Sequence, residues 1–138
     1  MNFPSNKILI VEDEKLPRNV LQKILIKLGY PVESAESAEK ALKILESEKI
    51  PLVITDLILP DMDGNELCKR IKKINSESVI YALSGQIAAF EPAKLEEIGF
   101  DGYMCKPVKI YVLKRAIEGA FDRIDKKRER QSVLLSKA

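Results

Sequence analysis

Short apolar runs alternate along the chain with longer segments in which apolar residues recur every three or four positions. The short runs predict buried strands at residues 7–11, 30–34, 52–55, 79–83 and 102–105. The longer segments predict amphipathic helices near residues 16–28, 38–45, 64–74, 88–98 and 112–124. Five successive strand–helix units imply a parallel sheet with helices on both faces, because parallel strands need crossover connections. The pattern therefore predicts a single α/β domain.

Capping residues mark several of the predicted helix boundaries. Ser37 and Asp63 precede helical stripes, and their side-chain oxygens can accept hydrogen bonds from the free N–H groups of a first turn. Gly29 is suited to end the first helix, whereas Pro92 blurs the start of the fourth. The apolar stripe of the last helix fades after Ile124. We therefore expect one domain over residues 6–124, followed over residues 125–138 by a basic extension of the last helix and a tail.

Composition narrows the class of protein. Apolar residues make up 46% of the chain and charged residues 32%, as in ordinary globular domains. The longest apolar runs fall far short of the roughly 20 residues of a membrane-spanning helix, and residues 1–7 do not resemble a signal peptide. These features predict a cytoplasmic protein without membrane contact. Two cysteines, Cys68 and Cys105, are too few for a disulfide framework and are expected to fill core space. The absence of histidine removes the commonest general base and zinc ligand.

Charge is distributed unevenly along the chain. Residues 1–105 carry a formal charge of −4 and residues 106–138 carry +6, which gives the net charge of +2. A basic C-terminal end could attract an acidic partner or nucleic acid. The simpler interpretation is a solvated helix end, and no recognition helix for DNA follows the domain. We therefore expect no direct binding to nucleic acid.

Charged and hydroxyl groups follow the predicted strands where each strand ends. These residues are Glu12, Asp13, Asp56, Ser84 and Lys106. Ligands of open parallel sheets bind beyond the carboxyl ends of the strands, so one site should contain all five. Neighbouring carboxylates repel one another, and a divalent cation relieves that repulsion. Carboxylate and carbonyl oxygens favour Mg²⁺, which commonly binds one or two carboxylates together with phosphate oxygens. The composition of the site thus favours phosphoryl chemistry.

Four short motifs at these strand ends resemble those of a known family. They are Val-Glu-Asp-Glu at 11–14, Ile-Thr-Asp-Leu at 54–57 with Pro-Asp-Met-Asp-Gly at 60–64, Ala-Leu-Ser-Gly at 82–85, and Tyr-Met-Cys-Lys-Pro at 103–107. In this order they resemble the receiver domains of two-component response regulators. The resemblance covers residues 6–124. It implies the doubly wound, flavodoxin-like fold with strand order 2-1-3-4-5.

The resemblance assigns a metal site to this chain. Asp56 is implied as the phosphoacceptor, forming an aspartyl phosphate by nucleophilic attack, and as a ligand of Mg²⁺. Asp13 would bind the cation directly, and Glu12 would reach it through water. The backbone carbonyl of Ile58 would supply a further ligand.

The resemblance also implies how the site acts on the rest of the domain. Lys106 and the hydroxyl of Ser84 would bind phosphoryl oxygens. Ser84 and the ring of Tyr103 would then move and alter a face formed by the fourth helix, fifth strand and fifth helix. The Lys106–Pro107 peptide is typically cis in the family.

The resemblance further implies the partners. A histidine kinase or a histidine phosphotransfer protein would donate the phosphoryl group, and a downstream target protein would recognise the altered face. That face is also a possible homodimer contact. The chain would catalyse only its own phosphorylation and dephosphorylation.

One alternative remains open at this stage, and residues of the chain argue against two others. The chain is either a stand-alone receiver or the receiver segment of a larger hybrid kinase or multi-domain regulator. A flavin-binding electron carrier would need a phosphate-binding loop where residues 12–14 are acidic. A magnesium-dependent phosphatase would need an acid–base carboxylate at the position of Ile58.

Overall fold

The computed structural model describes residues 5–85 and 92–136. It confirms a parallel five-stranded sheet with strand order β2-β1-β3-β4-β5. The strands are β1 (Ile8–Val11), β2 (Val32–Ala35), β3 (Leu52–Asp56), β4 (Val79–Ser84) and β5 (Gly102–Cys105). The helices are α1 (Lys15–Lys27), α2 (Ala38–Ser47), α3 (Gly64–Ile74), α4 (Pro92–Ile98) and α5 (Ile110–Ser136). The predicted doubly wound, flavodoxin-like architecture is therefore correct.

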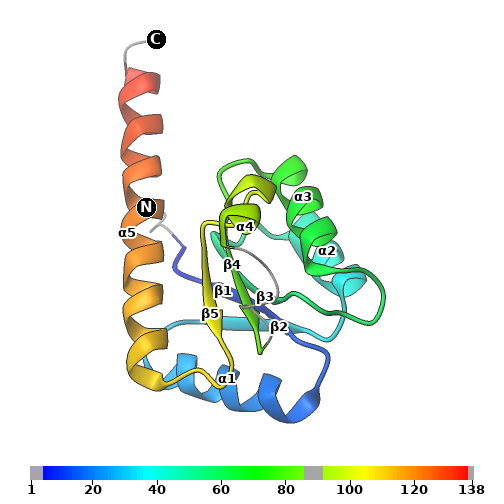
Figure 1. Ribbon diagram of the computed structural model, residues 1–138. Coiled ribbons are helices and arrows are strands. Elements are labelled where there is room, and N and C mark those ends of the chain that lie inside the picture. The colour runs from blue at the N-terminus through cyan, green and yellow to red at the C-terminus, as the bar shows by residue number, and fades with distance from the viewer. Residues whose placement is uncertain (1–4, 86–91, 137–138) are drawn as a thin grey trace.

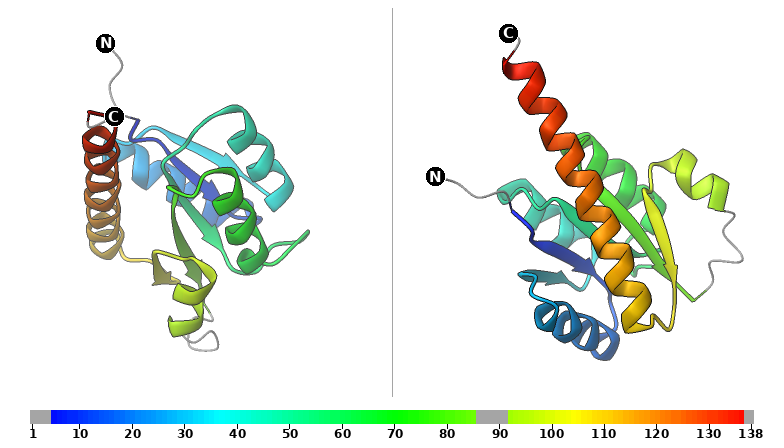
Figure 2. Two further views of the ribbon diagram at one scale, coloured as in Figure 1. Left: turned by 90° about the horizontal axis from the view of Figure 1, so that it is seen from above. Right: turned by 90° about the vertical axis from the view of Figure 1, so that its left-hand side faces the viewer.

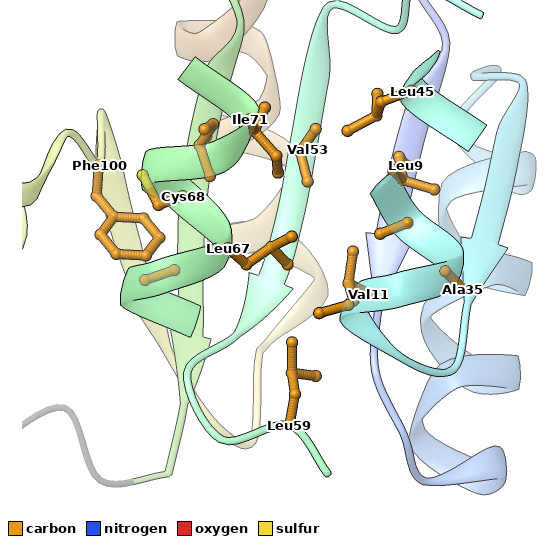
Figure 3. Close-up of a cluster of buried hydrophobic side chains, with 14 of the residues drawn as sticks. Leu9, Val11, Ala35, Leu45, Val53, Leu59, Leu67, Cys68, Ile71 and Phe100 are labelled. Atoms are coloured by element: carbon orange, nitrogen blue, oxygen red, sulfur yellow. The ribbon is translucent and has the colours of Figure 1, made fainter. Parts of the chain in front are cut away.

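The helices form two layers that sandwich the sheet, with α1 and α5 on one face and α2, α3 and α4 on the other (Figure 1). Alternate residues of the central strands point to opposite layers. Leu9 lies beside Leu45 of α2 and Val53 beside Ile71 of α3, within one apolar cluster (Figure 3). Ile10 belongs to the cluster of α1 and α5. Every residue of β1 and β3 is buried. Coverage of both faces explains why these strands are continuous apolar runs rather than alternating ones.

The predicted caps are present. Ser37 Oγ accepts a hydrogen bond from the backbone N–H of Lys40 at 3.2 Å, and Asp63 Oδ1 accepts one from Glu66 at 2.8 Å. Gly29 follows α1 with φ of 98°, a conformation that favours glycine. The fourth helix is described from Pro92 onward, and residues 88–91 of the predicted helix lie outside the described part.

Several apolar residues predicted to face the core are exposed. Leu16 and Val20 of α1 are 77% and 52% exposed, whereas Leu21 and Leu25 are buried. Ile74 of α3 is also exposed. Leu16 and Ile74 lie in the first or last turn of their helices, at an edge of the sheet, and Val20 shares the face of Leu16 one turn on. Apolar periodicity shows which residues share a face of a helix, but it does not show which turns of that helix lie over the sheet.

The prediction that both cysteines fill core space is half wrong. Cys68 of α3 is buried, but Cys105 of β5 is exposed. Since β5 is an edge strand, Tyr103 and Cys105 on one of its faces are exposed, while Met104 enters the core on the other face.

Helix α5 continues well beyond the domain core. Ile124 is its last buried residue, yet the helix continues to Ser136 and extends past the sheet (Figure 2). Arg128 ties the extension to the N-terminal segment, donating to the backbone carbonyl of Ser5 at 2.6 Å. The helix thus continues beyond the end of its apolar stripe. No helix of the described segments is long and apolar enough to cross a membrane.

The loop after β3 is fastened to both neighbouring helices. Asp63 caps α3, and Asp61 caps α2 from outside that helix. The two carboxylate oxygens of Asp61 accept hydrogen bonds from the N–H groups of Ala38 at 3.0 Å and Glu39 at 2.8 Å. A carboxylate also interacts favourably with the positive end of the helix dipole. Asp61 therefore joins two segments that are more than twenty residues apart.

Replacing Asp61 with alanine should lower the free energy of unfolding by about 1–2 kcal/mol, because two N–H groups of α2 lose their acceptor. Ser37→Ala, which removes one acceptor, should cost about 1 kcal/mol. Urea denaturation measures both. Lys43→Ala, at an exposed position of the same helix, is the control. An Asp61→Ala variant as stable as the control would contradict the assigned cap.

Gly64 is the close-approach point between α3 and β3. A Cβ atom there would lie 2.7 Å from the carbonyl oxygen of Asp56 and 2.8 Å from the Cα of Leu57, while nothing lies within 4 Å of a Cβ at Gly119 in α5. Gly64→Ala should therefore destabilise the protein by about 1–3 kcal/mol. Gly119→Ala should stabilise it by about 0.5–1 kcal/mol. Chemical denaturation of both variants tests this opposition, and a stabilising Gly64→Ala would contradict it.

Candidate functional site

The carboxyl edge of the sheet gathers the polar groups that the sequence predicted there. Strands β1, β3, β4 and β5 all end at this edge because they are parallel. The residues brought to it are Glu12, Asp13, Asp56, Ser84 and Lys106. Three of them are in direct side-chain contact, because Lys106 forms ion pairs with both Glu12 and Asp56.

Three carboxylates converge on one point. Glu12, Asp13 and Asp56 each offer an oxygen atom, and these atoms all lie within 4.8 Å of one another. Glu12 and Asp56 are only 2% and 8% exposed, whereas Asp13 is open to solvent. Like charges this close disfavour ionisation unless a cation is near. The arrangement suits a divalent cation that enters from the side of Asp13.

Lys106 partly neutralises the cluster. Its Nζ lies 2.6 Å from Oε1 of Glu12 and 2.8 Å from Oδ2 of Asp56. Burial by itself lowers the pKa of Lys106, but the hydrogen bonds to Asp56 and Glu12 outweigh burial and raise the pKa. The ammonium therefore stays charged and bridges the ends of β1 and β3.

Glu12 keeps one oxygen without a hydrogen bond. Burial raises the pKa of Glu12 to about 7, although the hydrogen bond from Lys106 opposes that rise. Its Oε2 is buried and has no hydrogen-bond partner among the described residues. A buried polar atom of this kind is costly unless something satisfies it. A hydrated cation between the carboxylates would do so, and the all-oxygen donor set fits Mg²⁺.

The backbone fixes Asp56 in place. The N–H of Ile58 donates to Oδ1 of Asp56 at 3.2 Å, and the hydroxyl of buried Thr55 donates to the backbone carbonyl of Asp56 at 3.0 Å. The other carboxylate oxygen, Oδ2, accepts from Lys106. The two oxygens thus have different environments. Ile58 has a 52% exposed side chain, and its carbonyl as a metal ligand stays a prediction.

Ser84 and Tyr103 differ in their surroundings. Ser84 is buried at the end of β4, and its carbonyl accepts a hydrogen bond from the N–H of Lys106 at 3.1 Å. Tyr103 of β5 is 46% exposed and borders a hollow between α4 and Arg123 of α5. The Lys106–Pro107 peptide is cis, as the resemblance implied. The switching roles of Ser84 and Tyr103 stay predictions.

An apolar groove beside the cluster was missed by sequence reasoning. It encloses about 470 Å³ between α1 and the loop after β5, and Glu12 and Lys106 reach its lining. The apolar residues at its rim include Leu16, Val20 and Pro107. The sequence signal for the groove is the i, i+4 pair of Leu16 and Val20 in the first turns of α1. The same spacing fits a face that packs on the core, which is where the apolar pattern places both residues.

Comparisons with known proteins agree with this geometry. The family model described as "Response regulator receiver domain" matches residues 8–118. The alkaline phosphatase synthesis transcriptional regulatory protein PhoP of Bacillus subtilis is 38% identical over 103 residues, covering 75% of this chain and 43% of that protein. The sensor histidine kinase RcsC of Salmonella typhimurium is 31% identical over 121 residues, covering 88% of this chain and 13% of that protein. The chain thus spans less than half the length of these two relatives.

Solved structures give the same result. A CheY-like receiver domain protein from Methanospirillum hungatei has a TM-score of 0.81 and 30% sequence identity, covering 90% of this chain and 99% of the other. The chemotaxis protein CheY4 of Vibrio cholerae, at 24% identity, shares the fold with a TM-score of 0.77, covering 85% of this chain and 99% of the other. With the family model, the fold and the strand-end cluster in agreement, the chain belongs to the response regulator receiver domain family.

Proposed function

We propose that this receiver domain is a signalling switch that accepts a phosphoryl group on Asp56 in the presence of Mg²⁺. The observation that carries the proposal is the pairing of Asp56 with Lys106 at 2.8 Å inside a cluster of three carboxylates. A carboxylate beside a lysine and a cation site is suited to attack phosphorus, because both positive groups would neutralise the charge of the incoming phosphoryl oxygens.

The chemical step follows from the positions of these side chains. An oxygen of Asp56 forms a bond to phosphorus while the bond from phosphorus to the donor atom breaks, and that electron pair leaves with the donor. When bound, Mg²⁺ supplies charge neutralisation to the phosphoryl oxygens. Asp13 and Asp56 would bind it directly, Glu12 through water, and Ile58 through its carbonyl. Lys106 exchanges a carboxylate contact for a phosphoryl oxygen, and Ser84 donates its hydroxyl to another.

The output of the switch is a change of protein–protein contacts. The added charge would draw Ser84 toward the phosphoryl group and turn Tyr103 inward, altering the face of α4, β5 and α5. Tyr103 starts from a half-exposed position beside the hollow at that face, which leaves it room to move. A downstream target protein, or a second copy of the chain, would recognise the altered face.

Receiver domains interact with histidine kinases and with downstream effectors. A histidine kinase or a histidine phosphotransfer protein is the proposed donor here, in the cytoplasm. The apolar groove rimmed by Leu16, Val20 and Pro107 supports this, because it adjoins Lys106 and Glu12 and so offers a donor protein a surface next to Asp56. The alternative that the chain is the receiver segment of a larger kinase or regulator is tested by its native length in cell extract.

Incubation with Mg²⁺ and acetyl phosphate should add one phosphoryl group, measured by intact mass spectrometry. Asp56→Asn or EDTA should abolish the gain, because the first removes the nucleophile and the second the cation. Asp122→Asn, at an exposed position of α5, is the matched control and should label like the wild type.

Two results would contradict the proposal. One is labelling that persists in Asp56→Asn. The other is a wild-type protein that gains nothing from acetyl phosphate and shows no spectral change with beryllofluoride and Mg²⁺.

Replacing Leu16 with serine should slow phosphotransfer from any histidine kinase that phosphorylates the wild type by about fivefold or more, since a contact of about 1 kcal/mol is lost. Labelling by acetyl phosphate, which needs no docking surface, should stay within about twofold of the wild-type rate. Leu134→Ser removes another largely exposed leucine, at the far end of α5, and is the control. Equal phosphotransfer to all three proteins would exclude the groove as the kinase contact.

A further inference from the structure

The loop that carries Glu12 and Asp13 lacks the usual support at the start of a helix. Helix α1 begins at Lys15, and its N-cap residue, Glu14, makes no side-chain capping hydrogen bond. The first turn of α1 also contains no acidic residue. Three consecutive acidic residues, 12–14, therefore occupy a turn that capping does not fix.

Arg18 provides the missing support from one turn further along α1. Its guanidinium NH1 lies 3.0 Å from the backbone carbonyl of Glu12 and 3.1 Å from that of Asp13. NH1 carries two hydrogens, so it can donate one to each carbonyl. The backbone N–H of Arg18 also donates to the carbonyl of Glu14 at 3.1 Å. Arg18 thus contacts the backbone of all three acidic residues.

The carbonyls of Glu12 and Asp13 belong to the two peptide units on either side of the Asp13 Cα atom. Because each peptide unit is rigid, holding both carbonyls also sets the direction in which the Asp13 side chain projects. The N–H of Glu12 is held on the other side by the carbonyl of Ala35 at 3.0 Å. The carboxylates of Glu12 and Asp13 therefore leave a backbone that is constrained from both directions. From that backbone, both carboxylates reach within 4.8 Å of the carboxylate of Asp56.

We propose that Arg18 is a positioning residue for the divalent cation site, holding the carboxylates of Glu12 and Asp13 in the arrangement that binds Mg²⁺. The inference rests on the proposed function. Arg18 acts through the backbone of the metal-binding residues, in the way that outer contacts of metal ligands orient them and tune affinity. Its positive charge by itself would repel Mg²⁺, so the proposed effect rests on the two carbonyl contacts and not on charge.

Two substitutions can separate the effect of the two carbonyl contacts of Arg18 from the effect of its positive charge. Lysine keeps the charge but presents a single ammonium on a flexible stem in place of a planar group. Glutamine removes the charge and is shorter. Arg18→Lys and Arg18→Gln should both weaken the site if the planar, two-carbonyl contact is what matters. Lys23→Gln makes the same charge change at an exposed position of α1 and serves as the control.

The test is a Mg²⁺ titration of the unphosphorylated protein by isothermal calorimetry, with far-UV circular dichroism to show that each variant is folded. Arg18→Gln should raise the dissociation constant about tenfold, Arg18→Lys should raise it severalfold, and Lys23→Gln should leave it unchanged. In acetyl phosphate labelling, the Mg²⁺ concentration for half-maximal rate should rise in parallel while the rate at saturating Mg²⁺ stays within about twofold.

The inference is overturned if both Arg18 variants bind Mg²⁺ with the wild-type constant, whatever their melting temperature, because Arg18 then only stabilises α1. It is also overturned if the rate at saturating Mg²⁺ falls while the dissociation constant does not change. If Arg18→Gln fails to fold, the folded Arg18→Lys variant decides by the same criteria. A wild-type protein that binds no Mg²⁺ and takes no phosphoryl group would instead refute the proposed function itself, so the two failures are distinguishable.

Discussion

The rest of the site depends on one electrostatic constraint, the balance of charge at the carboxyl edge of the sheet. Three carboxylates lie within 4.8 Å of one another, and Lys106 contacts two of them. With all groups ionised, one ammonium against three carboxylates leaves two negative charges, which a divalent cation balances. Burial of Glu12 and Asp56 strengthens every such interaction, because charges interact more strongly away from water. Positive charge held at this edge therefore stabilises the ionised cluster.

The layers of the domain make this concentration of charge possible. Both faces of β1 and β3 are covered, so the strands that present the acidic residues are the fully buried centre of the sheet. The loop after β3 is tied to α2 by Asp61 and to α3 by Asp63, with Gly64 packed against the carbonyl of Asp56. Packing energy from the apolar core thus holds charged groups where they repel one another, as is typical of functional sites.

The surface around the site divides into regions of different chemistry. The groove of Leu16, Val20 and Pro107 is apolar and adjoins Lys106. The face near Tyr103 is more polar and includes Arg123, which is tied to Asp101 at 3.1 Å. The proposed phosphoryl donor and the proposed target would therefore contact different surfaces. Beyond both, α5 continues to Ser136 as a largely exposed helix.

The sequence by itself determined the alternation of strands and helices, the caps at Ser37 and Asp63 and the strand-end positions of the polar residues, because apolar periodicity and short motifs are local properties of the chain. The strand order was implied by the resemblance of those motifs to receiver domains. Only the tertiary structure decided which apolar residues stay outside, as Leu16 and Cys105 do, since that depends on where the sheet ends and which parts of it the helices cover. The tertiary structure also decided the contacts of Lys106 with Glu12 and Asp56, which lie 94 and 50 positions away in the chain. It likewise decided that Asp61, from the loop after β3, caps α2. Even the reach of Arg18 back to two carbonyls depends on how the turn before α1 is folded. Such contacts leave no periodic signal, because they arise from the meeting of segments in space.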